Sequence, residues 1–183
     1  METLNAMAER RSSRSYQTRE VPRDLLERIV DAGRLAATAR NEQPWEFIVV
    51  TDAALRRSIA DVTEYGKHIA EAPTCVAVFC RDTKYYLEDG SAATQNMLVA
   101  AASLGVQSCW VAGDKKDYVK DVSRLLGVPV GFRLVSLVAL GYEKTAPPRV
   151  SKRALDQVIH WDTFTGIVQK TGRTLRHEGH PIP

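Results

Sequence analysis

Near the N-terminus, two arginines and a serine lie close enough in sequence to bind one anion. The segment reads Arg10-Arg11-Ser12-Ser13-Arg14. A guanidinium group presents a planar fork of N–H donors that matches phosphate oxygens, and a neighbouring hydroxyl adds a further donor. We therefore expect a phosphate-binding loop here. A solvated basic loop and an electrostatic arm for RNA are the two alternatives that the segment leaves open.

A second candidate site lies where a loop leads into a strand, at Asn41-Glu42-Gln43-Pro44-Trp45. Asparagine and glutamine amides each offer a donor and an acceptor, which is what the edge of a pyrimidine-like ring requires. Proline restricts the backbone, and tryptophan adds a large apolar body. An ordinary turn capped by Asn41 explains the same residues equally well.

Positive charge is concentrated at the two ends of the chain. Residues 1–40 have a net charge of +2 and residues 144–183 of +4, whereas residues 41–143 have −3. Lys152 and Arg153 could therefore contact the same anion as the N-terminal loop. A nucleic-acid binder more often shows a dense basic stripe with interleaved aromatic residues. We therefore expect a small anionic ligand and no nucleic acid.

Other kinds of active site find little support in the sequence. The four histidines include no pair at i, i+4 and no H-E-x-x-H motif, so we expect no metal site. The G-x-S-x-G, Walker A and G-x-G-x-x-G motifs are absent. Cys109 lies in a predicted strand beside Trp110, where a buried structural cysteine is the better interpretation.

The composition is that of a globular, non-membrane protein. The 183 residues are 44% hydrophobic and 26% charged, enough for about one domain with its own core. Three cysteines without a C-x-x-C pair fit a reducing compartment. The first ten residues contain no apolar signal core, and no apolar run is long enough to span a bilayer. We therefore expect a cytoplasmic protein that does not bind membranes.

Helical and strand patterns alternate along the chain and predict a layered α+β or α/β structure, with helical extensions at both ends. The predicted helices are 3–9, from Pro22 to about 37, 53–61, 85–104 and 115–126. The predicted strands are 45–51, 75–80, 107–111 and 132–142. The helix at 85–104 is apolar on more than one side, so we expect it to be central and buried.

Several motifs occur in a characteristic order. Residues 10–16 fit R-x-S-x-[RK]-x-[FY], and residues 41–47 fit N-x-Q-P-W-x-F. A D-x-x-x-x-x-Q-N motif follows at 89–96, then G-x-x-S-C-W at 105–110 and L-G-Y at 140–142. In this order, over residues 5–163, the chain resembles the nitroreductase family of FMN-dependent flavoproteins.

The resemblance implies an α+β fold with a central mixed or antiparallel sheet flanked by helices. It also implies a homodimer with FMN at its interface and with Gln95 and Asn96 on the helix that packs there. We expect one nitroreductase-like FMN-binding domain over residues 1–163. The extension over residues 164–183 is expected to wrap on the partner subunit.

The resemblance also assigns roles to site residues. Arg10 and Ser12 match phosphate and ribityl contacts, Arg14 the basic residue near the flavin N1/O2 edge, and Asn41 the ligand of the pyrimidine edge. The full set of expected cofactor-binding residues is Arg10, Arg11, Ser12, Arg14, Asn41, Gln43, Lys152 and Arg153. The chain departs from the family pattern at Gln107 and Val130, and these departures bear on the substrate class more than on FMN binding.

The implied activity is transfer of a hydride from NAD(P)H through FMN to a small oxidised acceptor, by a ping-pong mechanism. Nitroaromatics, quinones and flavins are the acceptors expected. Because the flavin N5 is the reactive atom, no catalytic side chain is required, and the protein binds, orients and tunes the cofactor. A cation near N1/O2 would stabilise the reduced, anionic flavin. An FMN carrier or redox sensor without reductase turnover is the alternative.

Overall fold

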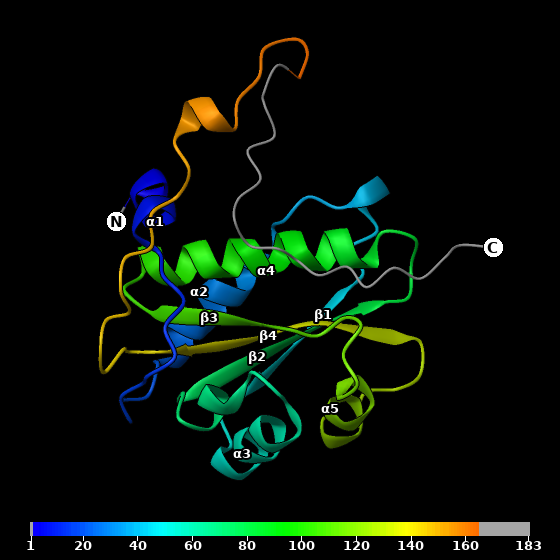
Figure 1. Ribbon diagram of the computed structural model, residues 1–183. Coiled ribbons are helices and arrows are strands. Elements are labelled where there is room, and N and C mark those ends of the chain that lie inside the picture. The colour runs from blue at the N-terminus through cyan, green and yellow to red at the C-terminus, as the bar shows by residue number, and fades with distance from the viewer. Residues whose placement is uncertain (1, 165–183) are drawn as a thin grey trace, which may run out of the picture. The chain divides into compact units, whose positions relative to one another are not determined.

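The computed structural model describes residues 2–164, in two units that divide between Pro148 and Arg149. A four-stranded sheet forms the centre of the first unit (Figure 1). Its strands are β1 (Trp45–Val50), β2 (Thr74–Arg81), β3 (Gln107–Ala112) and β4 (Phe132–Gly141). They lie in the order β1-β2-β4-β3, and each neighbouring pair is antiparallel.

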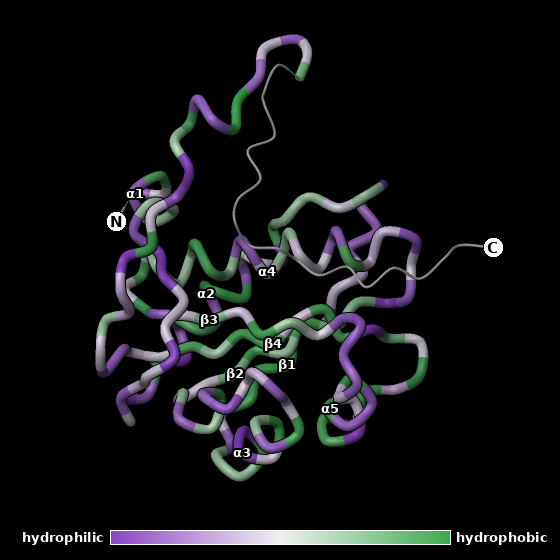
Figure 2. The backbone as a smooth tube through the Cα atoms, viewed as in Figure 1, coloured by the Kyte–Doolittle hydropathy of each residue, from purple (hydrophilic) through white to green (hydrophobic). Residues whose placement is uncertain are grey.

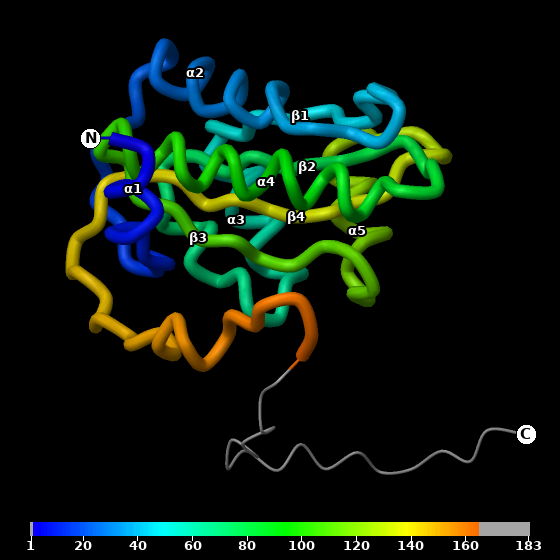
Figure 3. Tube along the Cα trace, turned by 90° about the horizontal axis from the view of Figure 1, so that it is seen from above, coloured from blue at the N-terminus to red at the C-terminus, as the bar shows by residue number. Residues whose placement is uncertain are grey.

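Helices cover both faces of this sheet. The five α-helices are α1 (Thr3–Glu9), α2 (Arg23–Arg34), α3 (Ala53–Val62), α4 (Tyr86–Ser103) and α5 (Val119–Leu125). Helices α2 and α4 pack on one face, whereas α3 and α5 pack on the other (Figure 1). Seen from above, α2 and α4 run side by side and extend in the same general direction as the strands (Figure 3). The expected α+β fold is confirmed.

The two central strands are apolar throughout because both of their faces are covered. Successive side chains of a strand point to opposite faces. In β2, Cys75 and Ala77 accordingly join the core beneath α3 and α5, whereas Val76 and Val78 join the core beneath α2 and α4. Figure 2 shows the strands as mainly hydrophobic and the surrounding loops as mainly hydrophilic.

Helix α4 is the long central helix expected from the sequence. Its buried residues lie on several sides, so it carries no single apolar stripe. It lies so close to β4 that a Cβ on Gly90 would come within 2.6 Å of Val135 Cγ2. The helix ends before Gly105, whose φ of +75° is a conformation that glycine adopts without strain.

One local expectation was wrong. Helix α5 begins at Val119 and not at 115, because Lys115 has a left-handed φ of 59° that a right-handed helix excludes. In the second unit, Leu155–Gln157 form a 3-10 turn. The expected domain over residues 1–163 and the extension over residues 164–183 stay predictions, and all but the first residue of that extension lies outside the described residues.

No helix among residues 2–164 is both long enough and apolar enough to cross a membrane.

Candidate active site

The basic loop that follows α1 is fixed to one end of the sheet. Ser12 and Ser108 form a parallel bridge, and the Ser13 N–H donates to the Ser108 carbonyl at 3.0 Å. Further along, Tyr16 bridges Glu143 just beyond β4. The loop therefore runs from the edge of β3 to the end of β4 in a defined register (Figure 1).

Buried polar contacts hold this loop in place. Ser13 is fully buried and donates through Oγ to Glu143 Oε2 at 3.1 Å. The Tyr16 hydroxyl donates to the Ser13 carbonyl at 2.7 Å, and burial raises the pKa of Tyr16 far above its ordinary value. Gln107 accepts the Glu143 N–H through Oε1 at 3.2 Å. Gln107, which departs from the family pattern, thus helps to anchor the strand end that supports the loop.

The buried thiol of Cys109 lies next to Ser108, the residue that bridges Ser12 of the basic loop. Burial raises the pKa of this thiol, whereas the positive charges of Arg14 and Arg10 and a hydrogen bond with Ser12 act to lower it. Within the described residues, neither the Arg10 nor the Arg14 guanidinium has a hydrogen-bond or ion-pair partner. The basic loop therefore carries two guanidinium groups without a protein partner in the part of the chain that the structure describes, and both charges act on one buried thiol.

Arg11 differs from its neighbours because its guanidinium turns back onto the end of α1. Its Nη1 donates to the carbonyls of Ala8 at 2.8 Å and Arg10 at 2.9 Å. These carbonyls would otherwise lack partners at the helix end. In this arrangement Arg11 stabilises the end of α1, and its expected contact with a cofactor stays a prediction.

The loop that carries Asn41 and Gln43 has an unusual backbone. Arg40, Asn41 and Gln43 have φ values of 54°, 56° and 45°, in the left-handed region that costs energy for residues other than glycine. Asn41 and Gln43 are exposed, and the side-chain amide of Asn41 has no hydrogen-bond partner among residues 2–164. Strained residues persist only where the surrounding structure holds them in place, and they cluster at ligand-binding sites.

The basic loop and the amide loop lie at opposite ends of the sheet. The basic loop meets the start of β3 and the end of β4, where Gln107 pairs with Gly141. The amide loop precedes β1, at the end where Trp45 pairs with Cys80. The ten residues of β4 span about 33 Å between these ends. One chain therefore does not bring Arg10 and Arg14 together with Asn41 and Gln43.

Lys152 and Arg153 belong to the second unit. Both are exposed and lie shortly before the 3-10 turn Leu155–Gln157. Their contact with the anion stays a prediction.

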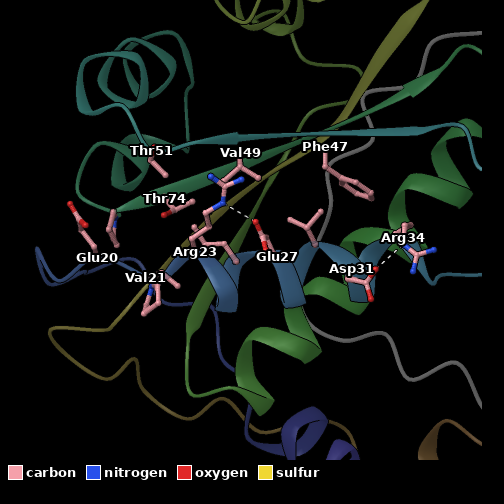
Figure 4. Close-up of a pocket in the computed structure, with 14 residues that line it drawn as sticks. Glu20, Val21, Arg23, Glu27, Asp31, Arg34, Phe47, Val49, Thr51 and Thr74 are labelled. Carbon is pink, nitrogen blue, oxygen red and sulfur yellow. Dashed lines mark hydrogen bonds and ion pairs between the residues drawn. The ribbon is translucent and has the colours of Figure 1, made fainter.

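A groove between α2 and β1 contains none of the predicted site residues (Figure 4). Its volume is about 910 Å³, and its lining includes Leu26, Val30 and Phe47. Two ion pairs within α2 border this groove. They join Arg23 to Glu27 at 2.8 Å and Arg34 to Asp31 at 2.7 Å. Within the described residues, no cluster of three metal-ligating side chains is present.

Two buried polar residues near these loops were not predicted as site residues. His68 is 8% exposed and stacks on Tyr16 with the rings 6.4 Å apart. Burial, and next the charge of Arg14, lower the pKa of His68. Asp89 is 4% exposed and accepts the Ala39 N–H at 3.1 Å. The D-x-x-x-x-x-Q-N motif included Asp89, but only the fold shows which backbone group it holds.

Comparison with known proteins gives consistent matches. The model of the family described as "Nitroreductase family" matches residues 7–78 and 64–142. A protein of Methanothermobacter thermautotrophicus, provisionally named NADH dehydrogenase/NAD(P)H nitroreductase, is 36% identical over 153 residues, which is 80% of each chain. An FMN-dependent nitroreductase structure from Clostridium difficile is 25% identical, with a TM-score of 0.83 over 88% of this chain and 99% of the other. A nitroreductase structure with bound FMN from Bacteroides fragilis is 27% identical, with a TM-score of 0.71 over 87% and 100%.

Proposed function

Because this chain belongs to the nitroreductase family of oxidoreductases, we propose that it binds FMN and transfers a hydride from NAD(P)H to a small oxidised acceptor. Nitroaromatics, quinones and flavins are the acceptors that we propose, in a ping-pong cycle in which NAD(P)+ leaves before the acceptor binds. The observation that carries the proposal is the pair of unpartnered guanidinium groups on a loop that Ser13 and Tyr16 fix to the sheet, with Ser12 between Arg10 and Arg14 in the sequence.

The residues of this loop suit the phosphate and polar chain of FMN. Arg10 and Ser12 supply N–H and O–H donors, and the loop that carries them is already fixed by Ser13 and Ser108. A donor set that is already ordered loses little entropy on binding. We propose that Arg14 lies near the N1/O2 edge of the flavin, where its charge stabilises negative charge on the ring.

When bound, FMN supplies the hydride chemistry at N5, and the chain's own residues bind and orient it. The exposed amides of Asn41 and Gln43 offer the paired donors and acceptors that the pyrimidine edge requires. We therefore propose these two side chains as ring-edge ligands. Lys152 and Arg153, exposed in the second unit, are proposed as further phosphate contacts.

The opposite placement of the two loops supports a homodimeric site. Helix α4, whose start lies near the amide loop and whose end lies near the basic loop, is about 27 Å long. This length exceeds that of FMN from ring edge to phosphate. A two-fold axis across α4 would bring the basic loop of one protomer to the amide loop of its partner. Gln95, exposed on α4, would then lie at the interface.

The second unit has the surface expected of a segment that packs on another chain. Leu155 is 72% exposed, Trp161 77% and Phe164 68%. Large apolar groups exposed over a short segment often mark an interaction surface. We propose that this segment, together with the extension over residues 164–183, packs on the partner subunit of the dimer.

The test is the visible spectrum of the purified protein, together with turnover. The wild-type protein should carry FMN, and replacing Arg10 and Arg14 with alanine should give a folded dimer largely without flavin. Arg23 and Arg34, which form ion pairs on α2, provide a matched double-alanine control that should remain yellow. A colourless wild-type protein that also fails to take up added FMN would overturn the proposal. Steady-state NAD(P)H oxidation with an acceptor separates an enzyme from an FMN carrier or redox sensor.

A further inference from the structure

We propose that Asp89 is a positioning residue that holds the amide loop in its strained conformation, so that Asn41 and Gln43 meet the ring edge of the flavin. This inference rests on the proposed function, because it assigns Asp89 a role in flavin binding. It also goes beyond that function, since Asp89 itself contacts only the backbone of the loop.

The amide loop needs an external support. Its three left-handed residues, Arg40, Asn41 and Gln43, are each in a conformation that is sparsely populated without surrounding contacts. Three hydrogen bonds from backbone N–H groups lie within the loop, Asn41 N–H to the Thr38 carbonyl at 3.3 Å, Glu42 N–H to the Ala39 carbonyl at 3.1 Å and Gln43 N–H to Thr38 Oγ1 at 3.3 Å. Each such bond contributes little net stability compared with the strain of three left-handed residues, so further contacts are needed.

Two charged side chains, one buried and one exposed, contact the loop on either side of Asn41. Asp89, in the first turn of α4, accepts the Ala39 N–H at 3.1 Å. Arg81, at the end of β2, donates through Nη2 to the Glu42 carbonyl at 2.9 Å. Because Ala39 and Glu42 flank Asn41, these two contacts fix the backbone from which its amide extends.

The burial of Asp89 indicates a role beyond packing. One carboxylate oxygen holds Ala39, whereas Oδ2 is buried without a hydrogen-bond partner among the described residues. Its environment includes the Cys80 thiol, whose pKa is raised to about 12 by burial and next by the charge of Asp89. A half-satisfied carboxylate is costly inside a protein. The N-terminal turn of α4 offsets part of this cost through the helix dipole.

The experiment compares Asp89→Ala and Asp89→Asn with a matched control, Asp52→Ala. Asp52 accepts the Leu55 N–H at 2.7 Å at the start of α3, so its loss also removes one bond between a carboxylate and a backbone N–H. For each variant we would measure the FMN dissociation constant, the midpoint potential of bound FMN and the melting temperature. Asp89→Asn retains an acceptor oxygen and is the conservative rescue.

We expect Asp89→Ala to bind FMN about tenfold to hundredfold more weakly, the range that corresponds to one hydrogen bond to a charged group. The flavin that remains bound should have a shifted midpoint potential, since the ring-edge amides are no longer fixed. Asp89→Asn should bind within about threefold of the wild type. Asp52→Ala should lower the melting temperature and leave the affinity and the potential at wild-type values.

Folded Asp89→Ala with wild-type affinity and potential would overturn the proposal, as would an equal loss in Asp52→Ala. If Asp89→Ala does not fold, Arg81→Ala tests the support of the amide loop by removing the contact with the Glu42 carbonyl. Wild-type FMN binding by Arg81→Ala would then refute the proposal. Failure of the wild-type protein to bind FMN would instead refute the proposed function itself.

Discussion

The placement of the two loops at opposite ends of the sheet leads to a prediction about mixed dimers. One subunit carries Arg10→Ala and Arg14→Ala, and the other carries Asn41→Ala and Gln43→Ala. Each homodimer has only defective sites. In the mixed dimer, a site shared between subunits gives one doubly defective pocket and one pocket with every wild-type residue, because each basic loop faces the amide loop of the other chain.

The size of the expected effect follows from the contacts that are removed. A hydrogen bond to a charged group contributes about 1.5–3 kcal/mol, so losing two guanidinium contacts costs about 3–6 kcal/mol. At about 1.4 kcal/mol per factor of ten, FMN affinity falls by about a hundredfold to ten-thousandfold. Two neutral amide contacts contribute less, about 1–3 kcal/mol together. The mixed dimer should nevertheless hold about half of the wild-type flavin at full affinity.

The assay is titration of FMN fluorescence quenching on mixed dimers purified through two different affinity tags. The reciprocal control places all four substitutions in one chain and pairs it with a wild-type chain. A shared site then leaves both pockets defective, whereas a site within one chain leaves one pocket intact. Half occupancy in this control, with none in the first mixed dimer, would refute a site shared between subunits.

Three further predictions concern the support of the site. Gln107→Leu leaves the Glu143 N–H without its acceptor and should lower the free energy of unfolding, measured by urea titration, by about 1–2 kcal/mol. Gln107→Glu keeps an acceptor oxygen and should retain most of the wild-type free energy of unfolding. Gly90→Ala should cost about 1–3 kcal/mol, because the new Cβ meets Val135 and Cys80, whereas Ser91→Ala should change little in the same titration. Burial and Arg14 lower the pKa of His68 from 6.5, so the unfolded chain binds its proton first as the pH falls, and folding stability is lost below about pH 6.5. His68→Phe should reduce this loss in urea titrations at pH 7.5 and 5.5, and equal losses in both proteins would contradict the assignment.

Most of the fold is predictable from the sequence because its pattern is strong where burial is complete. The apolar runs of β2 and β4 identify strands covered on both faces, and Gly105 marks the end of α4. The start of α5 is not predictable in this way. The polar residues from Lys115 onward fit a helix as well as a turn, and a single left-handed residue decides between them.

The candidate site is only partly predictable, because a motif identifies residues but does not give their positions in the fold. The basic loop follows α1 as expected, and the charges of Arg14 and Arg10 both act on the pKa of the Cys109 thiol. The separate role of Arg11 depends on the direction in which its side chain turns. The contact between Asp89 and Ala39 joins residues 50 positions apart in sequence, and no local pattern distinguishes this carboxylate from an ordinary acidic residue in the first turn of a helix.

The two motifs that point to one cofactor lie at opposite ends of the sheet in this small chain. A site shared between two subunits is compatible with that separation. A four-stranded sheet offers its two ends as binding surfaces, and here one end carries the basic loop and the other the amide loop. In the proposed homodimer, reversal of α4 by a two-fold axis would join the unlike ends twice, so one set of side chains would form two equivalent sites. Flavin binding and subunit association would then be coupled, because each proposed site is complete only in the dimer. Dilution that dissociates the subunits should therefore release FMN, and added FMN should favour the dimer.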